Sequence, residues 1–314
     1  MNSMKKEEFR FRSTSDVCDI RAVRYIPDGE IHAILQIAHG MREFVERYED
    51  FAKYLCDKGY LVTANDHLGH GDSVNSVDDW GFFAEENGNK AVLDDIHQLT
   101  TITKELYPNK PYFLLGHSMG SFYARQYMAE FGNELNGVIV MGTGQQSAGA
   151  LNAGMQACKL FALGKGWRYR SRAVTALAMG SYNKKFEPST TGVDWLTKDK
   201  NIVDWYIKEP RCSFMFTLNG FYNMFLGMSR LLDESFISKT PKQLPILFVS
   251  GEDDPVGDFG KGVEAAYNSI KNVGCVNAEM KLYPNDRHEI LNELDKEQVY
   301  EDLFNWMEEK LKCR

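Results

Sequence analysis

A serine lies between two glycines in Gly-His-Ser-Met-Gly at 116–120, which fits the pattern G-x-S-x-G. The apolar run "YFLL" precedes it, and "SFYARQYMAEFG" (121–132), with helical spacing, follows it. A strand that turns sharply into a helix strains its central residue, and side chains on either side would clash. The pattern therefore predicts that Ser118 presents a nucleophilic hydroxyl at the carboxyl edge of a sheet. The alternative is a plain turn with Ser118 as the helix N-cap.

A serine hydroxyl is a weak nucleophile until a base takes its proton, so a histidine and a carboxylate are also required. In a fold of this kind the acid follows the serine and the histidine comes last. His288 follows the strand-like run "EMKLYP" and is the only histidine after His117. Four acids follow the strand-like run "PILFVSG" (245–251), namely Glu252, Asp253, Asp254 and Asp258. We choose Asp254 because it precedes Pro255-Val256, with Asp253 next; either could instead be a turn acid or a helix cap.

The oxyanion formed by an attacking serine needs two N–H donors. The residue after the nucleophile supplies one, which is Met119 here, and the loop after an earlier strand supplies the other. In "QIAHGMREF" the strand ends at His39-Gly40, so Met41 offers its N–H. Both methionines are therefore predicted to act through the backbone, while their side chains pack or line a pocket.

His67, His70 and Asp72 raise the question of a metal, because catalytic metal sites often use histidines and acids on one loop. The spacing is H-x-x-H-x-D, with no further histidine directly after the aspartate. We expect buried hydrogen bonding rather than metal binding at these residues. The predicted mechanism needs no metal and no organic cofactor.

The elements that must position these residues alternate between short strand-like runs and longer helical patterns. Strands are predicted at 32–40, 135–144, 245–251 and 279–284, and helices at 42–60, 89–108, 121–132 and 298–311. Residues 61–73 are expected to form a strand followed by a glycine-rich loop, and residues 111–120 a strand and a tight turn. Strands separated by helices of this length indicate a parallel, right-handed α/β sheet. Residues 146–240 are helical in pattern, aromatic and without a clear strand. We therefore expect an α/β core at 1–145 and 241–314, with a helical insertion at 146–240.

Composition excludes several classes of protein. The 314 residues carry 44 acidic and 36 basic side chains, for a net charge of −8, which argues against nucleic-acid binding. Six cysteines, without C-x-x-C pairs, indicate reduced thiols: Cys18, Cys56, Cys158, Cys212, Cys275 and Cys313. The start "MNSMKKEEFRFRS" has no apolar run typical of a signal peptide, and other apolar runs are too short to span a membrane. We expect a cytoplasmic protein.

The chain resembles the α/β-hydrolase superfamily, and within it the monoacylglycerol lipase and lysophospholipase group, close to the serine aminopeptidase S33 family. The resemblance rests on "HGMREFVERYEDFAKYL", "NDHLGHGDS", "GHSMGS", "SGEDDPVGDFGKGV" and "YPNDRHEILNE", which span residues from about 30 onwards. It implies an eight-stranded, mostly parallel sheet with a helical cap over the active site. It carries over Ser118, Asp254 and His288 as the triad, with Met41 and Met119 as oxyanion donors. His67 departs from the family, in which arginine is more common there.

The insertion is rich in methionine and aromatic residues, which suits an acyl chain. The candidate substrate-binding residues are His39, Gly40, His117, Met155, Phe161, Trp167, Phe214, Phe221 and Phe225. Leu160, Phe216, Tyr222 and Met224 belong to the same apolar set. The alternative is that most of these side chains pack the cap helices together and onto the core. Exposed apolar residues of the cap could also contact a membrane transiently.

We therefore predict a serine hydrolase that cleaves small-molecule carboxylic esters of lipid type, such as monoacylglycerols or lysophospholipids. The alternatives are a small-ester carboxylesterase, an S33-type aminopeptidase or amidase, and a non-catalytic binder on the same fold. An aminopeptidase would need an acid in the cap to bind a free amine. Candidates are Glu187, Asp194, Asp199, Asp204 and Glu209. The oligomeric state is left open.

Overall fold

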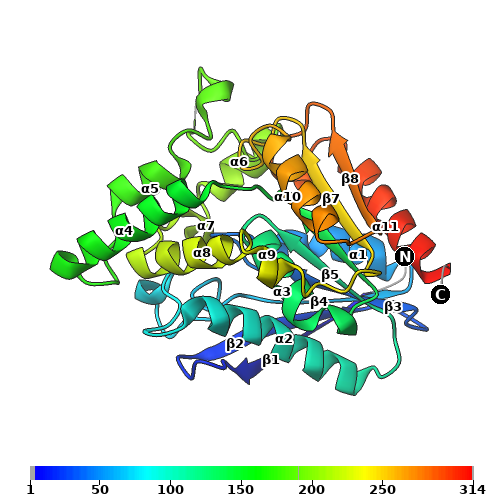
Figure 1. Ribbon diagram of the computed structural model, residues 1–314. Helices are drawn as coiled ribbons and strands as arrows, with labels where there is room; N and C mark the ends of the chain where they lie inside the picture. The colour runs from blue at the N-terminus through cyan, green and yellow to red at the C-terminus, as the bar shows by residue number, and fades with distance from the viewer. Residues whose placement is uncertain (1–3, 190, 313–314) are drawn as a thin grey trace.

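One eight-stranded sheet forms the centre of the protein in a computed structural model that describes residues 4–189 and 191–312 (Figure 1). The strands are β1 (Lys5–Arg12), β2 (Asp19–Ile26), β3 (Ala33–Ala38), β4 (Tyr60–Asn65), β5 (Tyr112–His117), β6 (Gly137–Met141), β7 (Ile246–Gly251) and β8 (Ala278–Tyr283). Their order is β1-β2-β4-β3-β5-β6-β7-β8. Strands β3 to β8 run parallel, while β1 and β2 are antiparallel to their neighbours. The predicted mostly parallel sheet of eight strands is confirmed.

Helices cover both faces of the sheet (Figure 1). The core helices are α1 (Glu49–Cys56), α2 (Gly88–Leu106), α3 (Met119–Phe131), α10 (Lys261–Asn272) and α11 (Lys296–Lys312). Short 3₁₀ turns occur at Val45–Tyr48, Val77–Asp79, Gly132–Glu134, Lys184–Phe186 and Ile290–Asn292. Apolar residues of α2, α3 and α10 share one buried cluster, and those of α1 and α11 share another. Because both faces are covered, the central strands are buried along their whole length, as parallel strands usually are.

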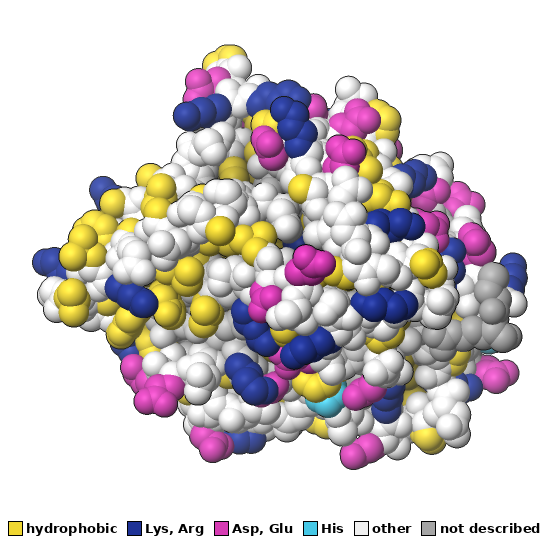
Figure 2. Space-filling view, viewed as in Figure 1, with side chains coloured by type: hydrophobic (Ala, Val, Ile, Leu, Met, Phe, Trp, Pro, Cys, Tyr) yellow, Lys and Arg dark blue, Asp and Glu magenta, His cyan; other side chains and the backbone are white. Residues whose placement is uncertain are grey.

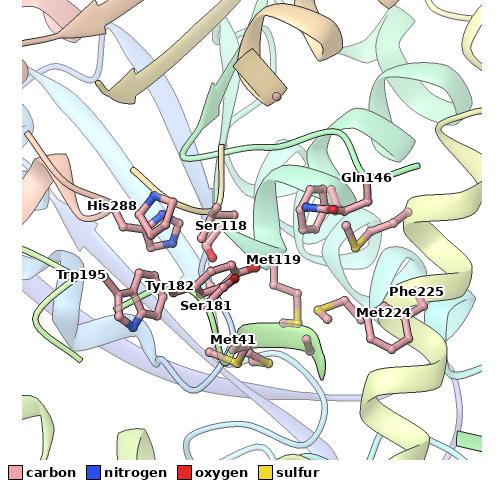
Figure 3. Close-up of a pocket in the computed structure, with 18 of the residues that line it drawn as sticks. Met41, Ser118, Met119, Gln146, Ser181, Tyr182, Trp195, Met224, Phe225 and His288 are labelled. Carbon is pink, nitrogen blue, oxygen red and sulfur yellow. The ribbon is translucent and has the colours of Figure 1, made fainter. Parts of the chain in front are cut away.

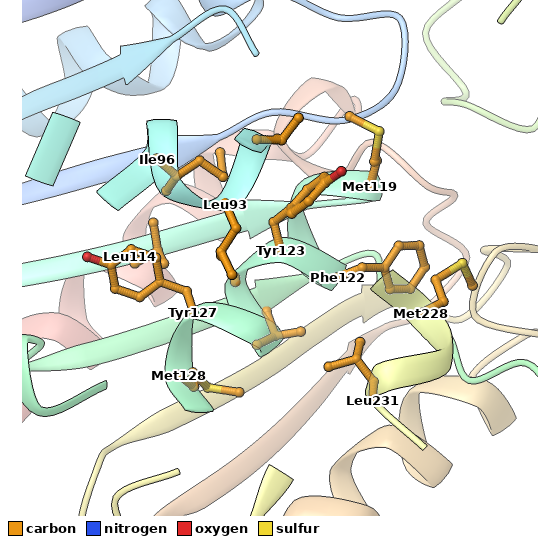
Figure 4. Close-up of a cluster of buried hydrophobic side chains, with 14 of the residues drawn as sticks. Leu93, Ile96, Leu114, Met119, Phe122, Tyr123, Tyr127, Met128, Met228 and Leu231 are labelled. Atoms are coloured by element: carbon orange, nitrogen blue, oxygen red, sulfur yellow. The ribbon is translucent and has the colours of Figure 1, made fainter. Parts of the chain in front are cut away.

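The helix that follows the candidate nucleophile is firmly packed. Figure 4 shows Phe122, Tyr123 and Tyr127 of α3 among side chains of α2, β5 and the segment around Met228. Tyr123 and Tyr127 are 1% and 0% exposed, and both belong to the cluster that covers this face of the sheet. A closely packed interior resists displacement, so the start of α3 is a rigid support for Ser118.

Between β6 and β7 the chain leaves the sheet, and we call residues 142–245 the β6–β7 insertion. Its helices are α4 (Ala148–Lys165), α5 (Arg172–Met179), α6 (Lys200–Tyr206), α7 (Pro210–Ser213), α8 (Leu218–Arg230) and α9 (Glu234–Ile237). The described part of the insertion contains no strand. Helix α8 packs against α4 on one side and against α2 and α3 on the other. The insertion thereby covers the edge of the sheet where Ser118 lies.

Sequence patterns located β3 to β8 but overlooked the first two strands. Strand β1 reads KKEEFRFR, with charged residues on its exposed face, and β2 contains Arg21 and Arg24, which are nevertheless buried. Arg21 is accommodated because Glu8 and Glu46 pair with its guanidinium. The helix predicted at 42–60 is shorter than expected: a 3₁₀ turn at Val45–Tyr48 leads into α1.

The described cysteines are free, buried thiols: Cys18, Cys56, Cys158, Cys212 and Cys275. Cys313 lies outside the described residues.

Candidate active site

Ser118 occupies a sharp turn between β5 and α3, with φ +53° and ψ −120°. A side chain at Gly116 would collide with the carbonyl oxygen of Gly120, and one at Gly120 with that of Ala38. Both flanking positions therefore require glycine. The Ser118 N–H donates to Met141 O at 2.9 Å, which fixes the backbone while the side chain faces a cavity.

His288 and Asp254 lie at the ends of neighbouring strands and are hydrogen-bonded. His288 Nδ1 is 2.9 Å from Asp254 Oδ2, and the Asp254 carboxylate also accepts from Ser250 Oγ at 2.9 Å and Val256 N–H at 2.8 Å. Burial by itself would raise the pKa of Asp254, but the charge of His288 and these donors lower the pKa below its ordinary value. An ionised Asp254 can hold His288 with its Nδ1 protonated and its Nε2 free to accept a proton.

The other ring nitrogen of His288 faces the cavity region of Ser118. His288 Nε2 is buried and has no hydrogen-bond partner among the described residues. The imidazole lies between His117 and Trp195, with ring centroids 4.8 and 5.0 Å away. Figure 3 shows His288 beside Ser118 at the cavity, which both residues line. A buried, unpaired acceptor beside a hydroxyl is the arrangement a general base requires.

The loop after β3 approaches Ser118 closely, since a Cβ on Gly40 would lie 3.0 Å from that of Ser118. His39 Nε2 accepts the His67 N–H at 2.9 Å, so in the neutral ring Nδ1 carries the proton. His39 Nδ1 therefore donates to Gly40 O, which is 2.7 Å away. In a trans peptide the N–H points opposite to the C=O, so the Met41 N–H is directed away from His39. Met119 begins α3, whose first N–H groups have no partner within the helix.

His39, His67 and His70 form a buried cluster, with ring centroids 4.1 to 6.3 Å apart. Burial lowers the pKa of all three rings, to about 4 for His39, so they are neutral near pH 7. Asp72 is turned away from them and lies near Arg21 and Arg211. In the part of the chain that the structure describes, no three His, Cys, Asp or Glu side chains are grouped as metal ligands.

A buried charged network behind the site was not anticipated from the sequence. Glu43 Oε2 accepts from Gly40 N–H at 2.8 Å and lies 3.4 Å from His117 Nδ1. The Tyr48 hydroxyl also donates to Glu43. Desolvation opposes the charge on Glu43, yet His117 and Arg47 hold its pKa well below the ordinary value. The one signal in the sequence is the spacing of Glu43, three residues after the glycine of the oxyanion loop.

The same network reaches the loop that carries the base. The Arg47 guanidinium is paired with Glu289, directly after His288, and both side chains are 2% exposed. His117 Nε2 lies 3.3 Å from His288 O and, with Nδ1 held by Glu43 and Tyr48, can donate to that carbonyl. Burial by itself would lower the pKa of His117, but the charge of Glu43 and its contact with Nδ1 raise that pKa above its ordinary value. Buried charges thus connect the oxyanion loop, the serine turn and the histidine loop.

The cavity over Ser118 has a volume of about 390 Å³, within the roughly 300–1,000 Å³ of small-molecule sites. One end is apolar and is lined from α3, α4 and α8 by Met119, Phe122, Ala150, Leu151, Ala153, Gly154, Met224, Phe225 and Met228. The other end includes Arg42, Ser181, Tyr182, Trp195, Tyr206 and Glu289. Figure 3 places Met224 and Phe225 on the opposite side of Ser118 from Trp195 and His288.

The structure brings only some of the predicted substrate-binding residues to this cavity. Gly40 and Phe225 line it. His39 and His117 lie behind it, in the networks described above. Met155, Phe161, Trp167, Phe214 and Phe221 are absent from its lining. Phe161 is 38% exposed, while Trp167 packs on Tyr222 and Phe214 on Trp80.

Comparison with known proteins agrees with this geometry. The family model of the serine aminopeptidases, S33, matches residues 29–295. The chain is 26% identical to a monoglyceride lipase homolog of Monkeypox virus, over 89% of this chain and 91% of that protein. It is also 26% identical to the monoglyceride lipase of Rattus norvegicus, over 91% and 85% of the two chains.

Solved structures give the same result. A thermostable carboxyl esterase of Bacillus coagulans, in complex with glycerol, superimposes with a TM-score of 0.90 at 30% identity, covering 98% of this chain and 99% of that one. A soluble variant of the monoglyceride lipase of Saccharomyces cerevisiae gives a TM-score of 0.76 at 20% identity, covering 98% and 96%.

The sheet, the serine turn and these similarities define an α/β-hydrolase. Within that class the chain belongs to the serine aminopeptidase S33 family. None of the helices in the described residues is long and apolar enough to cross a membrane.

Proposed function

We propose that this protein is a serine hydrolase that cleaves carboxylic esters of lipid type, with Ser118, His288 and Asp254 as its catalytic triad. The observation that carries the proposal is the pair of His288 and Asp254, 2.9 Å apart, with Nε2 of the same ring unpaired beside Ser118. The similarity to monoglyceride lipases and to a carboxyl esterase supports an ester as the substrate.

In the first half-reaction, Ser118 Oγ attacks the ester carbonyl carbon while His288 Nε2 accepts the hydroxyl proton. The N–H groups of Met41 and Met119 stabilise the oxyanion of the tetrahedral intermediate. The carbon–oxygen bond to the alcohol then breaks, and the alcohol leaves with the proton from His288. Asp254 keeps the imidazole oriented and stabilises its charged form.

In the second half-reaction, water attacks the acyl-Ser118 ester and passes a proton to His288. The second tetrahedral intermediate uses the same two N–H donors. Its collapse releases the carboxylic acid and returns the proton to Ser118. Neither half-reaction requires a metal or an organic cofactor, because the triad, the two backbone N–H groups and water provide every group that takes part.

The two ends of the cavity support a lipid substrate. An acyl chain fits between α3, α4 and α8, where the lining residues are all uncharged and mostly methionine, leucine and phenylalanine. The alcohol would occupy the other end, where the Ser181 and Tyr182 side chains provide hydroxyl groups. A small polyol ester with one acyl chain, such as a monoacylglycerol, matches this division. A lysophospholipid shares the acyl part but has a larger, charged alcohol.

We also propose that residues 146–240 act as a cap that contacts membranes transiently. Leu160, Leu163 and Leu177 are 70%, 87% and 60% exposed on α4 and α5. Figure 2 shows hydrophobic side chains gathered on the left of the molecule, where Figure 1 places α4. No acid occurs between Glu134 and Glu187, whereas seven lysines or arginines do. Apolar residues among cations favour an anionic lipid surface.

An aminopeptidase is the second candidate, because the family includes such enzymes. It needs an accessible acid to bind the free amine of its substrate. The five cap acids considered from the sequence are absent from the cavity lining, and Glu43 and Glu289 are paired with Arg47. Asp258, which is exposed and lines the cavity, is the one other acid among the described lining residues that could bind a free amine. The ester proposal therefore has the stronger support.

The test is the measurement of kcat/KM for p-nitrophenyl esters from acetate to dodecanoate, then for monoacylglycerols, lysophospholipids and amino-acyl p-nitroanilides. We expect the highest values for medium or long acyl chains and none above background for Ser118→Ala. By comparison with serine-protease triads, Asp254→Asn should lower kcat about 10⁴-fold. A maximum at acetate would favour a small-ester carboxylesterase, and activity on anilides alone an aminopeptidase. No hydrolysis of any substrate would leave a binder on the same fold.

A further inference from the structure

Helices α4 and α8 pack together, and Gly154 of α4 lies directly against the ring of Phe225 of α8. A Cβ built on Gly154 would lie 2.7 Å from Phe225 Cε2 and 2.9 Å from Cδ2, closer than real contacts of that kind. Gly154 is buried in the middle of α4, where glycine destabilises a helix by roughly 0.5–1 kcal/mol relative to alanine. Its backbone has no positive φ that would demand glycine. The requirement at this position is therefore space for the Phe225 ring.

The Phe225 ring also neighbours Phe221, which lies one turn earlier in α8. Phe221 is stacked on it, with centroids 6.0 Å apart and an interplanar angle of 23°. Phe221 is itself 1% exposed and packs edge-on against Phe216, which is also 1% exposed. Because this aromatic stack is part of the buried core, volume added at residue 154 would be taken from the cavity rather than from the core.

Gly154 and Phe225 both line the cavity at its apolar end. In Figure 3 the Phe225 ring lies beyond Met119 and Met224 as seen from Ser118. An acyl chain bound at Ser118 would run past Met119 and meet the Phe225 ring. The place where the chain meets this ring is set by the absence of a side chain at residue 154.

We propose that Gly154 and Phe225 together fix the longest acyl chain that the site accepts, with Gly154 as the specificity-determining residue. This inference rests on the proposed ester hydrolase function and assigns its chain-length limit to one contact between two helices. A single methylene in an apolar pocket changes kcat/KM by about 10–200-fold, so one residue can move the preferred chain length.

The main variants are Gly154→Ala and Gly154→Val, assayed on p-nitrophenyl esters from acetate to dodecanoate. We expect kcat/KM for dodecanoate, relative to butyrate, to fall about tenfold or more in Gly154→Val, with a smaller fall in Gly154→Ala. Gly149→Ala is the matched control. Gly149 is in the same helix and gains the same methyl group, but that methyl would have no atom within 4 Å. The control should keep the wild-type profile.

Phe225→Ala tests the same contact in the opposite direction. Removing the ring should raise the ratio of dodecanoate to butyrate about tenfold, and longer esters should become substrates. This variant also keeps the test decisive if Gly154→Val fails to fold, which a thermal melt followed by circular dichroism would reveal.

Covalent labelling provides a readout independent of ester turnover. Fluorophosphonates with ethyl and dodecyl chains attach to an activated serine, and intact mass spectrometry gives each rate. We expect Gly154→Val to lower the dodecyl rate relative to the ethyl rate, and Phe225→Ala to raise it. Wild-type ratios in all folded variants would overturn the inference while leaving the proposed function intact. Absence of ester hydrolysis by the wild-type protein would instead overturn the proposed function.

Discussion

The backbone N–H of Gly40 donates a hydrogen bond of 2.8 Å to the carboxylate of Glu43, so a buried charge holds the loop proposed to bind the oxyanion. The same carboxylate accepts from Tyr48 and faces His117, whose other nitrogen lies near His288 O. Groups that stabilise a transition state act best when they are fixed before the reaction. The position of Glu43 therefore links the stability of the fold to the rate of the chemical step.

Replacement of Glu43 by alanine should damage both properties. It leaves the Gly40 N–H without its acceptor and takes one of two buried partners from Arg47, which keeps Glu289, and from His117, which keeps Tyr48. Removal of one member of a buried charged network typically lowers the free energy of unfolding by about 3–5 kcal/mol. Urea unfolding measures that change, and steady-state kinetics should show a lower kcat with a smaller change in KM. Glu43→Gln keeps an acceptor for Gly40 and should retain more activity. Exposed Glu85→Gln is the control, and equal behaviour of Glu43→Ala and this control would refute the role.

The backbone conformation of Ser118 should be strained and should therefore lower the free energy of unfolding. Its φ of +53° with ψ of −120° lies outside the regions that side chains normally allow, and such strain amounts to about 1–3 kcal/mol. Ser118→Gly should therefore raise the free energy of unfolding by about 1 kcal/mol and abolish activity. Ser118→Ala should abolish activity without that gain, because alanine retains the Cβ. A less stable Ser118→Gly protein would contradict the assignment of strain.

Acid should destabilise the protein through its buried histidines. Burial lowers the pKa of His70 well below 6.5, so below pH 6.5 the unfolded chain binds a proton there that the folded chain does not. The contribution of neutral His70 to the free energy of unfolding is complete above pH 6.5. It decreases as the pH falls, by up to about 1.4 kcal/mol per pH unit. His117, with its raised pKa, loses its contribution only as the pH rises above 6.5.

Comparison of His70→Phe with the wild type isolates this effect. Buried Asp66 and Asp95 have pKa values raised to about 6, so their protonation favours the folded state as the pH falls. This effect is present in both proteins and cancels in the difference between them. Between pH 6.5 and 4.5 the variant should lose less stability than the wild type. Phe216→Leu disturbs the same surroundings but keeps the histidines, so it should retain the wild-type slope. Parallel curves for His70→Phe and wild type would rule out the titration.

Membrane contact should depend on the outer face of α4. Leu163 is 87% exposed there, and replacement by glutamate should weaken binding to vesicles with phosphatidylserine about tenfold, by loss of apolar contact and addition of like charge. Leu294→Glu is the matched control, since Leu294 is also exposed (67%) but belongs to the α/β part of the chain and not to the insertion. Sedimentation with vesicles measures binding, and hydrolysis of soluble p-nitrophenyl butyrate should be unchanged in both. Equal binding by the two variants would show that the outer face of α4 does not contact the membrane.

Much of the fold could be predicted because the central strands leave plain patterns. Strand β5 is wholly apolar up to the glycine, and the helical pattern of α3 begins directly after Ser118. Strand β1 gives no comparable signal, since its exposed face alternates lysine, glutamate and arginine. Such an edge strand is defined by its pairing with β2, which the sequence of one strand does not reveal.

The lining of the cavity was harder to predict than the residues at its centre. Apolar composition nominated Phe221 and Phe225 equally, yet only Phe225 lines the cavity, because the two rings stack and one lies behind the other. Gly154 gives no such signal, because a residue without a side chain adds nothing to an apolar pattern. These assignments depend on how α4 packs against α8, a relationship between segments more than 50 residues apart.

Strands β6 and β7 pair directly, from Val138 with Ile246 to Met141 with Val249, although the whole β6–β7 insertion separates them in the chain. The two strands meet in the sheet with no residue of the described insertion between them. Natural or laboratory evolution can therefore exchange that segment as a module, and so change which esters fit, while Ser118, Asp254 and His288 stay where the strands put them.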